Sequence, residues 1–349
     1  MNIKQTIKSL VERRDLSRES MRDLIQAMLY GEITPVQIAG ILVALRMKGE
    51  TVDEIVGAAQ VMRELSLKVE VDHPYLIDTC GTGGDESSTF NISTASALVA
   101  AAAGAKVAKH GNRSVSSQCG SADILEAAGV FLGLNSEQVA RSITSVGVGF
   151  LFAPQHHQAM KQVVLPRKEL GLRTIFNLLG PLTNPAQAKK QVLGVYAPEW
   201  VPIIANVLNN LGTQRALVVH GNGLDEVTIE GDTHVCELKQ GEVHCYQVSP
   251  ASLGVVGHSL DIVKVNSIEE SLALFKLALG ETRKKIHPAQ DILALNAGAA
   301  IYVAGLVDQW KRGVEFAYDL IFSGQAFQKL EELIEFTNVC KMSLDERNS

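Results

Sequence analysis

The residues with the clearest chemical potential form a glycine-rich turn. An apolar run ending in Leu76-Ile77 is followed by Asp78-Thr79-Cys80-Gly81-Thr82-Gly83-Gly84-Asp85, and a helix is expected from Ser93 to Ala103. Glycines let main-chain N–H groups approach an anionic oxygen closely, and a helix dipole favours negative charge at its start. The turn therefore predicts an anion-binding site. Asp85 also indicates a positive partner, either a metal ion or a polarised sugar hydroxyl.

The alternatives for this turn imply different functions. Glycine-rich turns between a strand and a helix also occur for tight packing alone. The spacing is not Gly-x-Gly-x-x-Gly, and no acidic residue follows a second strand about twenty residues on, as a dinucleotide site requires. It is not the Gly-x-x-x-x-Gly-Lys-Ser/Thr of a P-loop either. The turn therefore predicts phosphate binding by some other scheme.

A polar loop follows the next expected strand, Ala105 to Ala108. It reads Lys109-His110-Gly111-Asn112-Arg113-Ser114 and contains two cations. Loops at the carboxyl ends of neighbouring parallel strands meet at one sheet edge, so this loop is expected beside the glycine turn. A solvated basic loop is the alternative.

The loop continues through a flexible run, Ser116 to Ser121. Ser121 is expected to cap a helix over residues 122–128. The N-terminus of that helix is a second candidate position for binding a phosphate group.

A third cluster combines histidines with arginines. Phe152-Ala153-Pro154-Gln155-His156-His157 is followed by Arg167 and Arg173, which flank Gly171. Adjacent histidine side chains usually diverge, so one of the two is expected to be structural. An arginine at such a turn could hold a carboxylate bidentately. The stretch Asn177 to Pro185 is rich in turn-forming residues and is expected to act as a hinge or an interface.

The fourth cluster is an acidic pair, Asp225-Glu226. It follows an expected strand, Ala216 to His220, and the loop Gly221 to Leu224. Two carboxylates in a strand-end loop suit Mg²⁺, which prefers hard oxygen ligands and keeps several waters. Surface acidic pairs are common, so only its convergence with the other loops makes this pair informative.

The elements that must position these residues differ along the chain. Residues 1–70 predict helices only, with Thr34-Pro35 as a helix start and Thr51-Val52-Asp53-Glu54 as a capping box. From about residue 72, short apolar strands alternate with helices, which predicts a mainly parallel sheet with helices on both faces. Four of these strands are residues 75–78, 105–108, 192–196 and 216–220; residues 236–245 predict a hairpin that turns at Gln240-Gly241. Its histidines and cysteines fit cross-strand pairs better than a zinc motif.

The amino-acid composition indicates the broad class of protein. The chain has 349 residues, 46% of them hydrophobic and 20% charged, and a net charge of -6, which argues against general nucleic-acid binding. No apolar run is long enough to span a bilayer, and no signal-peptide pattern opens the chain. Five scattered cysteines suggest free thiols in a reducing compartment. We therefore expect a cytoplasmic protein with a frayed polar tail after Met342.

Together, these motifs make the chain resemble the anthranilate phosphoribosyltransferase family, over nearly its whole length. The matching stretches are Gly81 to Asp85, Asn91-Ile92-Ser93-Thr94, Lys109 to Ser114, Arg173 to Asn177 through Asn184-Pro185, and Asp225-Glu226. The resemblance implies an α/β protein of the nucleoside phosphorylase-like, class IV phosphoribosyltransferase fold. A small helical domain, residues 1–70, would be joined by a segment near 165–190, and an α/β catalytic domain with a mainly parallel central sheet would span 72–349.

The resemblance also implies an activity and its partners. The phosphoribosyl group of PRPP (5-phosphoribosyl 1-diphosphate) would pass to the amino group of anthranilate with release of pyrophosphate, the second step of tryptophan biosynthesis from chorismate. Mg²⁺, as two ions, would be the cofactor. The chain would form a homodimer through its helical domain and bind neither nucleic acid nor membrane.

The resemblance also assigns roles to individual residues of the matching motifs. The residues implied to bind PRPP are Gly81, Gly84, Asp85, Thr89, Asn91, Ser93, Thr94, Lys109, Asn112, Arg113, Ser117 and Ser121. Those implied to bind anthranilate are Gly81, His110, Asn112 and Arg167, with Arg167 facing the carboxylate. Those implied to bind the metal are Ser93, Asp225 and Glu226, while Asp85 would face the diphosphate-ribose and the hydrated metal. No catalytic base is identified, although His110 could accept a proton late in the reaction.

Two departures and two alternatives accompany this assignment. Gln158 stands where the family commonly has proline, and Gln118-Cys119 where it usually has Lys-Ser, which bears on affinity rather than reaction type. A pyrimidine nucleoside phosphorylase-like enzyme would share the fold, but the acidic pair argues against it because that reaction has no metal-bound pyrophosphate to hold. A non-catalytic nucleic-acid-binding relative should have a basic groove and eroded motifs.

Overall fold

The N-terminal part of the chain is a bundle of helices. The computed structural model describes residues 2–114, 119–284 and 287–348. Its first four helices are α1 (Ile3–Val11), α2 (Arg18–Leu29), α3 (Pro35–Lys48) and α4 (Val52–Leu65). The expected starts of α3 and α4 are confirmed, because the side chains of Thr34 and Thr51 each cap the backbone in a capping box.

A seven-stranded sheet forms the centre of the remaining chain, in the order β3-β2-β1-β4-β5-β6-β7. The strands β1 to β5 run parallel, and β6 and β7 are antiparallel additions at one edge. Their bounds are β1 (Leu76–Gly81), β2 (Lys106–Gly111), β3 (Val148–Phe152), β4 (Lys190–Gly194), β5 (Arg215–Gly221), β6 (Thr233–Lys239) and β7 (Glu242–Val248). The predicted parallel strands and the hairpin are confirmed. The strand β3, a short edge strand that contains Gly149, was not predicted.

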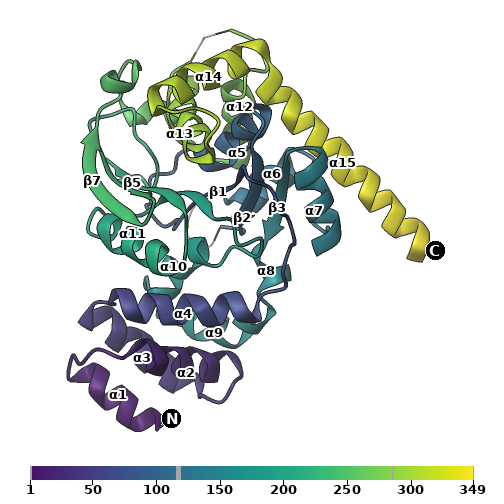
Figure 1. The fold of residues 1–349 in the computed structure, drawn as a ribbon. Helices are drawn as coiled ribbons and strands as arrows, with labels where there is room; N and C mark the ends of the chain where they lie inside the picture. The colour runs from purple at the N-terminus through teal and green to yellow at the C-terminus, as the bar shows by residue number, and fades with distance from the viewer. Residues whose placement is uncertain (1, 115–118, 285–286, 349) are drawn as a thin grey trace.

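Helices cover both faces of this sheet (Figure 1). The helices that follow the bundle in the chain are α5 (Ile92–Ala102), α6 (Ser121–Ala127), α7 (Ser136–Ser145), α8 (Ala153–His156), α9 (Lys161–Leu170), α10 (Ile175–Leu179), α11 (Trp200–Asn210), α12 (Ile268–Ala278), α13 (Ala289–Ala304), α14 (Trp310–Ser323) and α15 (Gln325–Asn348). Successive side chains of the inner strands belong to different hydrophobic cores on the two faces of the sheet. On β5, for example, Leu217 and Val219 belong to the core under α5 and α13, whereas Ala216 and Val218 belong to the core that includes α4, α10 and α11.

That second core unites the helical bundle with the sheet. It contains apolar side chains of α2, α3 and α4 together with those of β4, β5 and α11. Helix α9 packs against α2 and α3 as well, although it comes about a hundred residues later in the chain. The bundle is therefore not an independent globule but one layer of a continuous structure (Figure 1).

Three sequence expectations about local structure are wrong. Ser121 is the first residue of α6, and Gly120 occupies the N-cap position instead. The tail after Met342 is not frayed but helical to Asn348. Cys236 and Cys245 are joined in a disulfide, so not all five cysteines are free thiols; Cys80, Cys119 and Cys340 are.

The disulfide follows from the hairpin register. Cys236 on β6 lies directly opposite Cys245 on β7, with 4.0 Å between the Cα atoms. This cross-strand pairing also removes the zinc alternative for the two cysteines. In the part of the chain that is described, no helix is long and apolar enough to cross a membrane.

Candidate functional site

The glycine turn leaves the sheet at the carboxyl end of β1. Gly81 pairs with Gly194 of β4, and the N–H of Thr82 donates to the Gly194 carbonyl at 2.9 Å. Gly83 and Gly84 then adopt φ values of 66° and 73°, in the left-handed region that glycine adopts without strain. The turn conformation thus depends on the glycines that marked it in the sequence.

The acidic loop after β5 lies directly against this turn. The N–H of Gly83 donates to Asp225 Oδ2 at 2.7 Å, and the N–H of Asp225 donates to Asp85 Oδ2 at 3.3 Å. A Cβ atom on Gly81 would lie only 2.1 Å from Asp225 Oδ2. The two motifs, far apart in the sequence, meet as the parallel topology predicts.

Glu226 reaches the start of α5. The N–H of Ser93 donates to Glu226 Oε1 at 3.0 Å, so the carboxylate occupies the N-terminal end of the helix. Lys109, buried at the end of β2, donates from Nζ to Ser93 Oγ at 3.3 Å and also to the Thr79 carbonyl. Lys109 was expected in a loop after this strand, but β2 extends to Gly111, so Lys109 contributes its cation from within the strand.

The two carboxylates lie where charge is costly. Burial, and then the neighbouring Asp85, raise the pKa of Asp225 to about 7. Burial, and then Asp225, raise the pKa of Glu226 well above its usual range, and Lys109 only partly opposes this. Such a crowded acidic pair is a place where a cation would be stabilised.

The donor set fits a hard divalent cation that keeps most of its own ligands. Asp225 and Glu226 supply carboxylate oxygens, and Ser93 supplies a hydroxyl beside them. No group of three or more His, Cys, Asp or Glu side chains arranged to hold a metal occurs within residues 2–114, 119–284 and 287–348. A metal here would therefore take its other ligands from water and from substrate oxygens, as Mg²⁺ does at phosphate sites.

The segment between the turn and α5 is held by the second half of the chain. Thr89 forms a β-bridge with Lys264. Asn91 Nδ2 donates to the Cys119 carbonyl at 3.0 Å, and Asn91 Oδ1 accepts from Ser271 Oγ at 3.2 Å. The hydroxyl of Thr94 is buried without a partner in the described part of the chain.

The remaining residues expected at the phosphates are engaged locally. Arg113 forms ion pairs with Asp123 at 3.0 Å and Glu126 at 2.7 Å, both on α6. The side-chain Oδ1 of Asn112 accepts a hydrogen bond from the Arg113 N–H. The main-chain carbonyl of Asn112 accepts one from Ser121 Oγ at 3.2 Å. The predicted site residue Ser117, like Gln118, lies outside the described residues.

The two ring nitrogens of His110 differ in their surroundings. Its Nδ1 lies 3.1 Å from the Gly180 carbonyl, which can only accept, so Nδ1 carries the proton. Nε2 is buried without a partner among the described residues, and the ring lies 5.1 Å from that of His157. Burial, and then His157, lower the pKa of His110 to about 3. The neighbouring His156 instead bonds the Leu67 carbonyl, at 2.9 Å, which is a structural role.

Arg167 is a partly buried cation beside an aromatic ring. It projects from α9, with its guanidinium carbon 5.3 Å from the ring centre of Phe176. Burial lowers its pKa, and it makes no hydrogen bond or ion pair within the part of the chain that is described. Phe176 lies on α10, and Gly180 follows this helix directly. The helix therefore connects the ring beside Arg167 to the carbonyl group that His110 contacts.

Two further residues support the site, although neither was predicted as a site residue. Asp78, an acid inside an apolar strand, accepts from the His110 N–H at 3.2 Å and from Gln191 Nε2 at 3.3 Å. Arg173 contacts the glycine turn itself, through the carbonyl of Gly84. An acid within a buried strand is a sequence signal for Asp78. Arg173 lies in a stretch that matches the family, but no local pattern indicates its contact with the glycine turn.

Comparisons with known proteins agree along the chain. Two family models match, described as the helical bundle domain of a glycosyl transferase family, at residues 4–66, and its a/b domain, at residues 73–327. The chain is 55% identical over 346 residues to the anthranilate phosphoribosyltransferase of Marinomonas sp. (strain MWYL1), covering 99% of each. It is 56% identical over 339 residues to that of Hahella chejuensis, covering 97% of this chain and 98% of the relative.

Solved structures of similar proteins have the same fold. The anthranilate phosphoribosyltransferase of Thermus thermophilus superposes with a TM-score of 0.90 at 43% identity, covering 95% of this chain and 99% of that one. The Saccharomyces cerevisiae enzyme in complex with PRPP and Mg superposes with a TM-score of 0.87 at 28% identity, covering 97% and 98%.

Proposed function

The chain belongs to the anthranilate phosphoribosyltransferase family, and on that premise we propose that the residues around the glycine turn are its active site. The enzyme transfers the phosphoribosyl group of PRPP to the amino group of anthranilate and releases pyrophosphate, in tryptophan biosynthesis. Neither the phosphorylase-like alternative nor the nucleic-acid-binding alternative accounts for relatives of this identity over the full length.

The observation that carries the site is the meeting of Asp225-Glu226 with the glycine turn and the start of α5. Anion-binding N–H groups, a buried lysine and two adjacent carboxylates suit a pyrophosphate that arrives with its own cations. We assign PRPP binding to Gly81, Gly84, Asp85, Thr89, Asn91, Ser93, Thr94, Lys109, Asn112, Arg113, Ser117 and Ser121. To reach the phosphates, Arg113 would have to leave Asp123 and Glu126.

Ser93, Asp225 and Glu226 would hold Mg²⁺, which we propose binds as two ions. When bound, Mg²⁺ would neutralise the charge that develops on the leaving pyrophosphate. A neighbouring structure that contains PRPP and Mg supports the use of Mg²⁺. Lys109 and the N–H groups at the start of α5 would stabilise the same charge from the protein side.

Anthranilate would be oriented by Gly81, His110, Asn112 and Arg167, with the guanidinium of Arg167 paired to the carboxylate. The aromatic amine is unprotonated at neutral pH. Its nitrogen forms the bond to the anomeric carbon as the bond to the pyrophosphate oxygen breaks, and the acidic anilinium nitrogen then gives its proton to water or to the released pyrophosphate. A pKa of about 3 makes His110 a weak base, so we assign Nε2 to accept a hydrogen bond from the amine. Positioning then supplies much of the rate.

The test of this function is an assay of anthranilate fluorescence with and without PRPP and Mg²⁺. Wild-type enzyme should consume anthranilate only when both are present. The double variant Asp225→Asn/Glu226→Gln should lose activity by about 100-fold or more with its fold intact, because the charges that hold the cation are gone. Another adjacent acidic pair, on α15, provides the matched control: Glu331→Gln/Glu332→Gln should keep full activity. Full activity in the first double variant would contradict the metal assignment.

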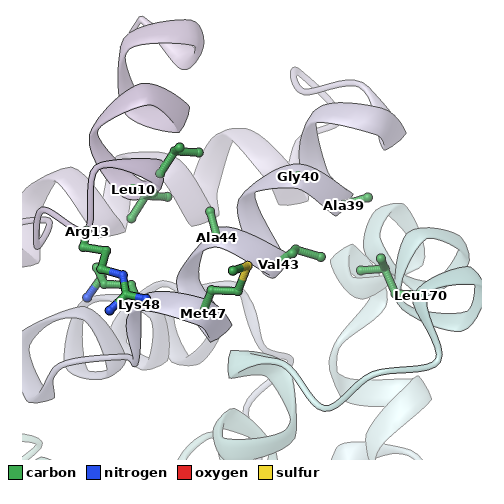
Figure 2. A pocket seen from close by; sticks show the side chains of 10 residues that line it. Leu10, Arg13, Ala39, Gly40, Val43, Ala44, Met47, Lys48 and Leu170 are labelled. Atoms are coloured by element: carbon green, nitrogen blue, oxygen red, sulfur yellow. The ribbon is translucent and has the colours of Figure 1, made fainter.

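The helical bundle offers a surface for a second copy of the chain. A cavity of about 380 Å³ opens between α1, α3 and Leu170 at the end of α9. Figure 2 shows Val43, Met47 and Leu170 bordering it. Exposed apolar side chains surround it, with Val11 68% and Met47 71% exposed. We propose that this face forms a homodimer, since an apolar patch of this kind commonly marks an interface. The domain limits of 1–70 and 72–349, and a cytoplasmic location, stay predictions.

A further inference from the structure

Arg173 joins two parts of the proposed site that come from different layers of the fold. It follows Gly171, the left-handed residue (φ 59°) that ends α9, the helix carrying Arg167. Its Nη2 donates to the Gly84 carbonyl and to Glu86 Oε1, the latter at 2.9 Å. Its guanidinium carbon lies 4.7 Å from the ring centre of Tyr196. One planar side chain thus contacts the glycine turn and the loop after β4 together.

The turn needs such a contact because two residues that follow the glycines also have positive φ values. Glu86 and Ser88 adopt φ values of 60° and 55°, which residues with a Cβ rarely take. One end of the turn is fixed by Asp225 through Gly83, and the other by the Val265 N–H, which donates to the Ser88 carbonyl at 2.8 Å. Between these fixed points, Arg173 binds both the Gly84 carbonyl and the Glu86 side chain.

We propose that Arg173 is a positioning residue that holds the glycine turn in its PRPP-binding conformation from the α9–α10 connection. The proposal rests on the proposed function. Arg173 acts by binding the Gly84 carbonyl, which fixes the orientation of that peptide and of the neighbouring N–H groups. The helix that presents Arg167 to anthranilate is thereby tied to the turn that binds PRPP.

Kinetics of substituted enzymes test the role. Arg173→Ala should raise the KM for PRPP about 10-fold, the effect of losing one charge-assisted hydrogen bond, and leave the KM for anthranilate within about 2-fold. Arg173→Lys keeps the positive charge but loses the planar guanidinium with its several N–H donors, and should recover only part of the affinity for PRPP. Glu86→Ala should have a smaller effect in the same direction, and the double variant should be no worse than Arg173→Ala. Arg22→Ala, which removes an arginine–glutamate pair within the bundle, is the matched control and should leave both constants unchanged.

Hydrogen exchange of the ligand-free protein separates positioning from direct phosphate binding. In Arg173→Ala, amides in segment 83–88 should exchange at least about 3-fold faster than in wild type, while other segments keep their rates. Unchanged exchange in this segment, or an unchanged KM for PRPP, would overturn the proposal. If wild-type enzyme consumed no anthranilate, the proposed function would fail, and the exchange experiment would still decide whether Arg173 holds the turn.

Discussion

Arg167 illustrates how the surroundings of one side chain limit what it can bind. Its guanidinium lies partly buried over Phe176 and is without an acidic partner in the described part of the chain. A cation withdrawn from water without a counterion is costly, so a ligand carboxylate beside it would be strongly favoured.

We therefore expect Arg167→Ala to act on anthranilate. The variant should raise the apparent KM for anthranilate by about 10- to 100-fold, because a charge-assisted, bidentate pairing is lost. The KM for PRPP should change by less than about 2-fold. Steady-state kinetics with each substrate varied in turn provide the measurement. A change confined to the KM for PRPP would show that the assignment is wrong.

Two buried histidines should make the ligand-free protein sensitive to acid. Burial lowers the pKa of His110 to about 3 and that of His157 to about 4, from an ordinary value of 6.5. The unfolded chain therefore binds protons that the folded chain does not between pH 6.5 and pH 4. Stability is fully present above pH 6.5 and falls with the pH through this range, by on the order of 1–2 kcal/mol per histidine by pH 5.

Urea unfolding at about pH 7.5 and about pH 5 measures this effect. The double variant His110→Asn/His157→Asn should lose about 2–4 kcal/mol less than wild type between the two values. His244→Asn removes a histidine that is 72% exposed, so its loss of stability should match that of wild type. Equal pH dependence in the double variant and wild type would contradict the expectation.

At the scale of elements, the site is made by the fit between the end of β1 and the loop after β5. Gly81 leaves room for the Asp225 carboxylate, which would lie 2.1 Å from a Cβ atom. The start of α5 provides the N–H group that binds Glu226. Both contacts depend on the strands ending at one edge of the sheet.

Gly81→Ala should consequently displace Asp225 without unfolding the protein. Activity should fall by about 100-fold, and the Mg²⁺ concentration needed for half-maximal activity should rise, since one metal-binding carboxylate is moved. The double variant Gly81→Ala/Asp225→Ala should lose less activity than the sum of the two single losses, because the two changes share the contact between Gly81 and Asp225. Fully additive losses would show that the displacement of Asp225 does not contribute to the effect of Gly81→Ala. The urea midpoint reports whether the fold is retained.

For the whole molecule, the helical bundle has two apolar faces. One face packs onto the sheet through the core that includes α4, α10 and α11. The other, around α1 and α3, is exposed and encloses the cavity in Figure 2. A second copy of the chain would cover that exposed face.

Charge placed on this face should separate the copies. We expect wild-type protein to be a dimer by size-exclusion chromatography with light scattering, and Val43→Glu/Met47→Glu to be a monomer, because buried carboxylates across an apolar interface are costly. Met342→Glu, a substitution of an exposed methionine on α15, is the control and should stay dimeric. A monomeric wild type, or a dimeric Val43→Glu/Met47→Glu variant, would contradict the proposed surface.

The sequence by itself determined the local elements and the chemistry they carry. Capping at Thr34 and Thr51 and the hairpin turn at Gln240-Gly241 are encoded by residues within a few positions of one another. The convergence of the glycine turn and the acidic loop also followed from sequence, because parallel strands place their carboxyl ends at one edge.

Only the tertiary structure decided which distant side chains meet. The disulfide between Cys236 and Cys245, the pairing of Arg113 with α6 and the contact of Arg173 with Gly84 depend on strand register and on how the layers pack. The reason is physical. A cap or a turn is stabilised within one segment, whereas these contacts exist only after segments far apart in the chain have been brought together by burial of the hydrophobic cores.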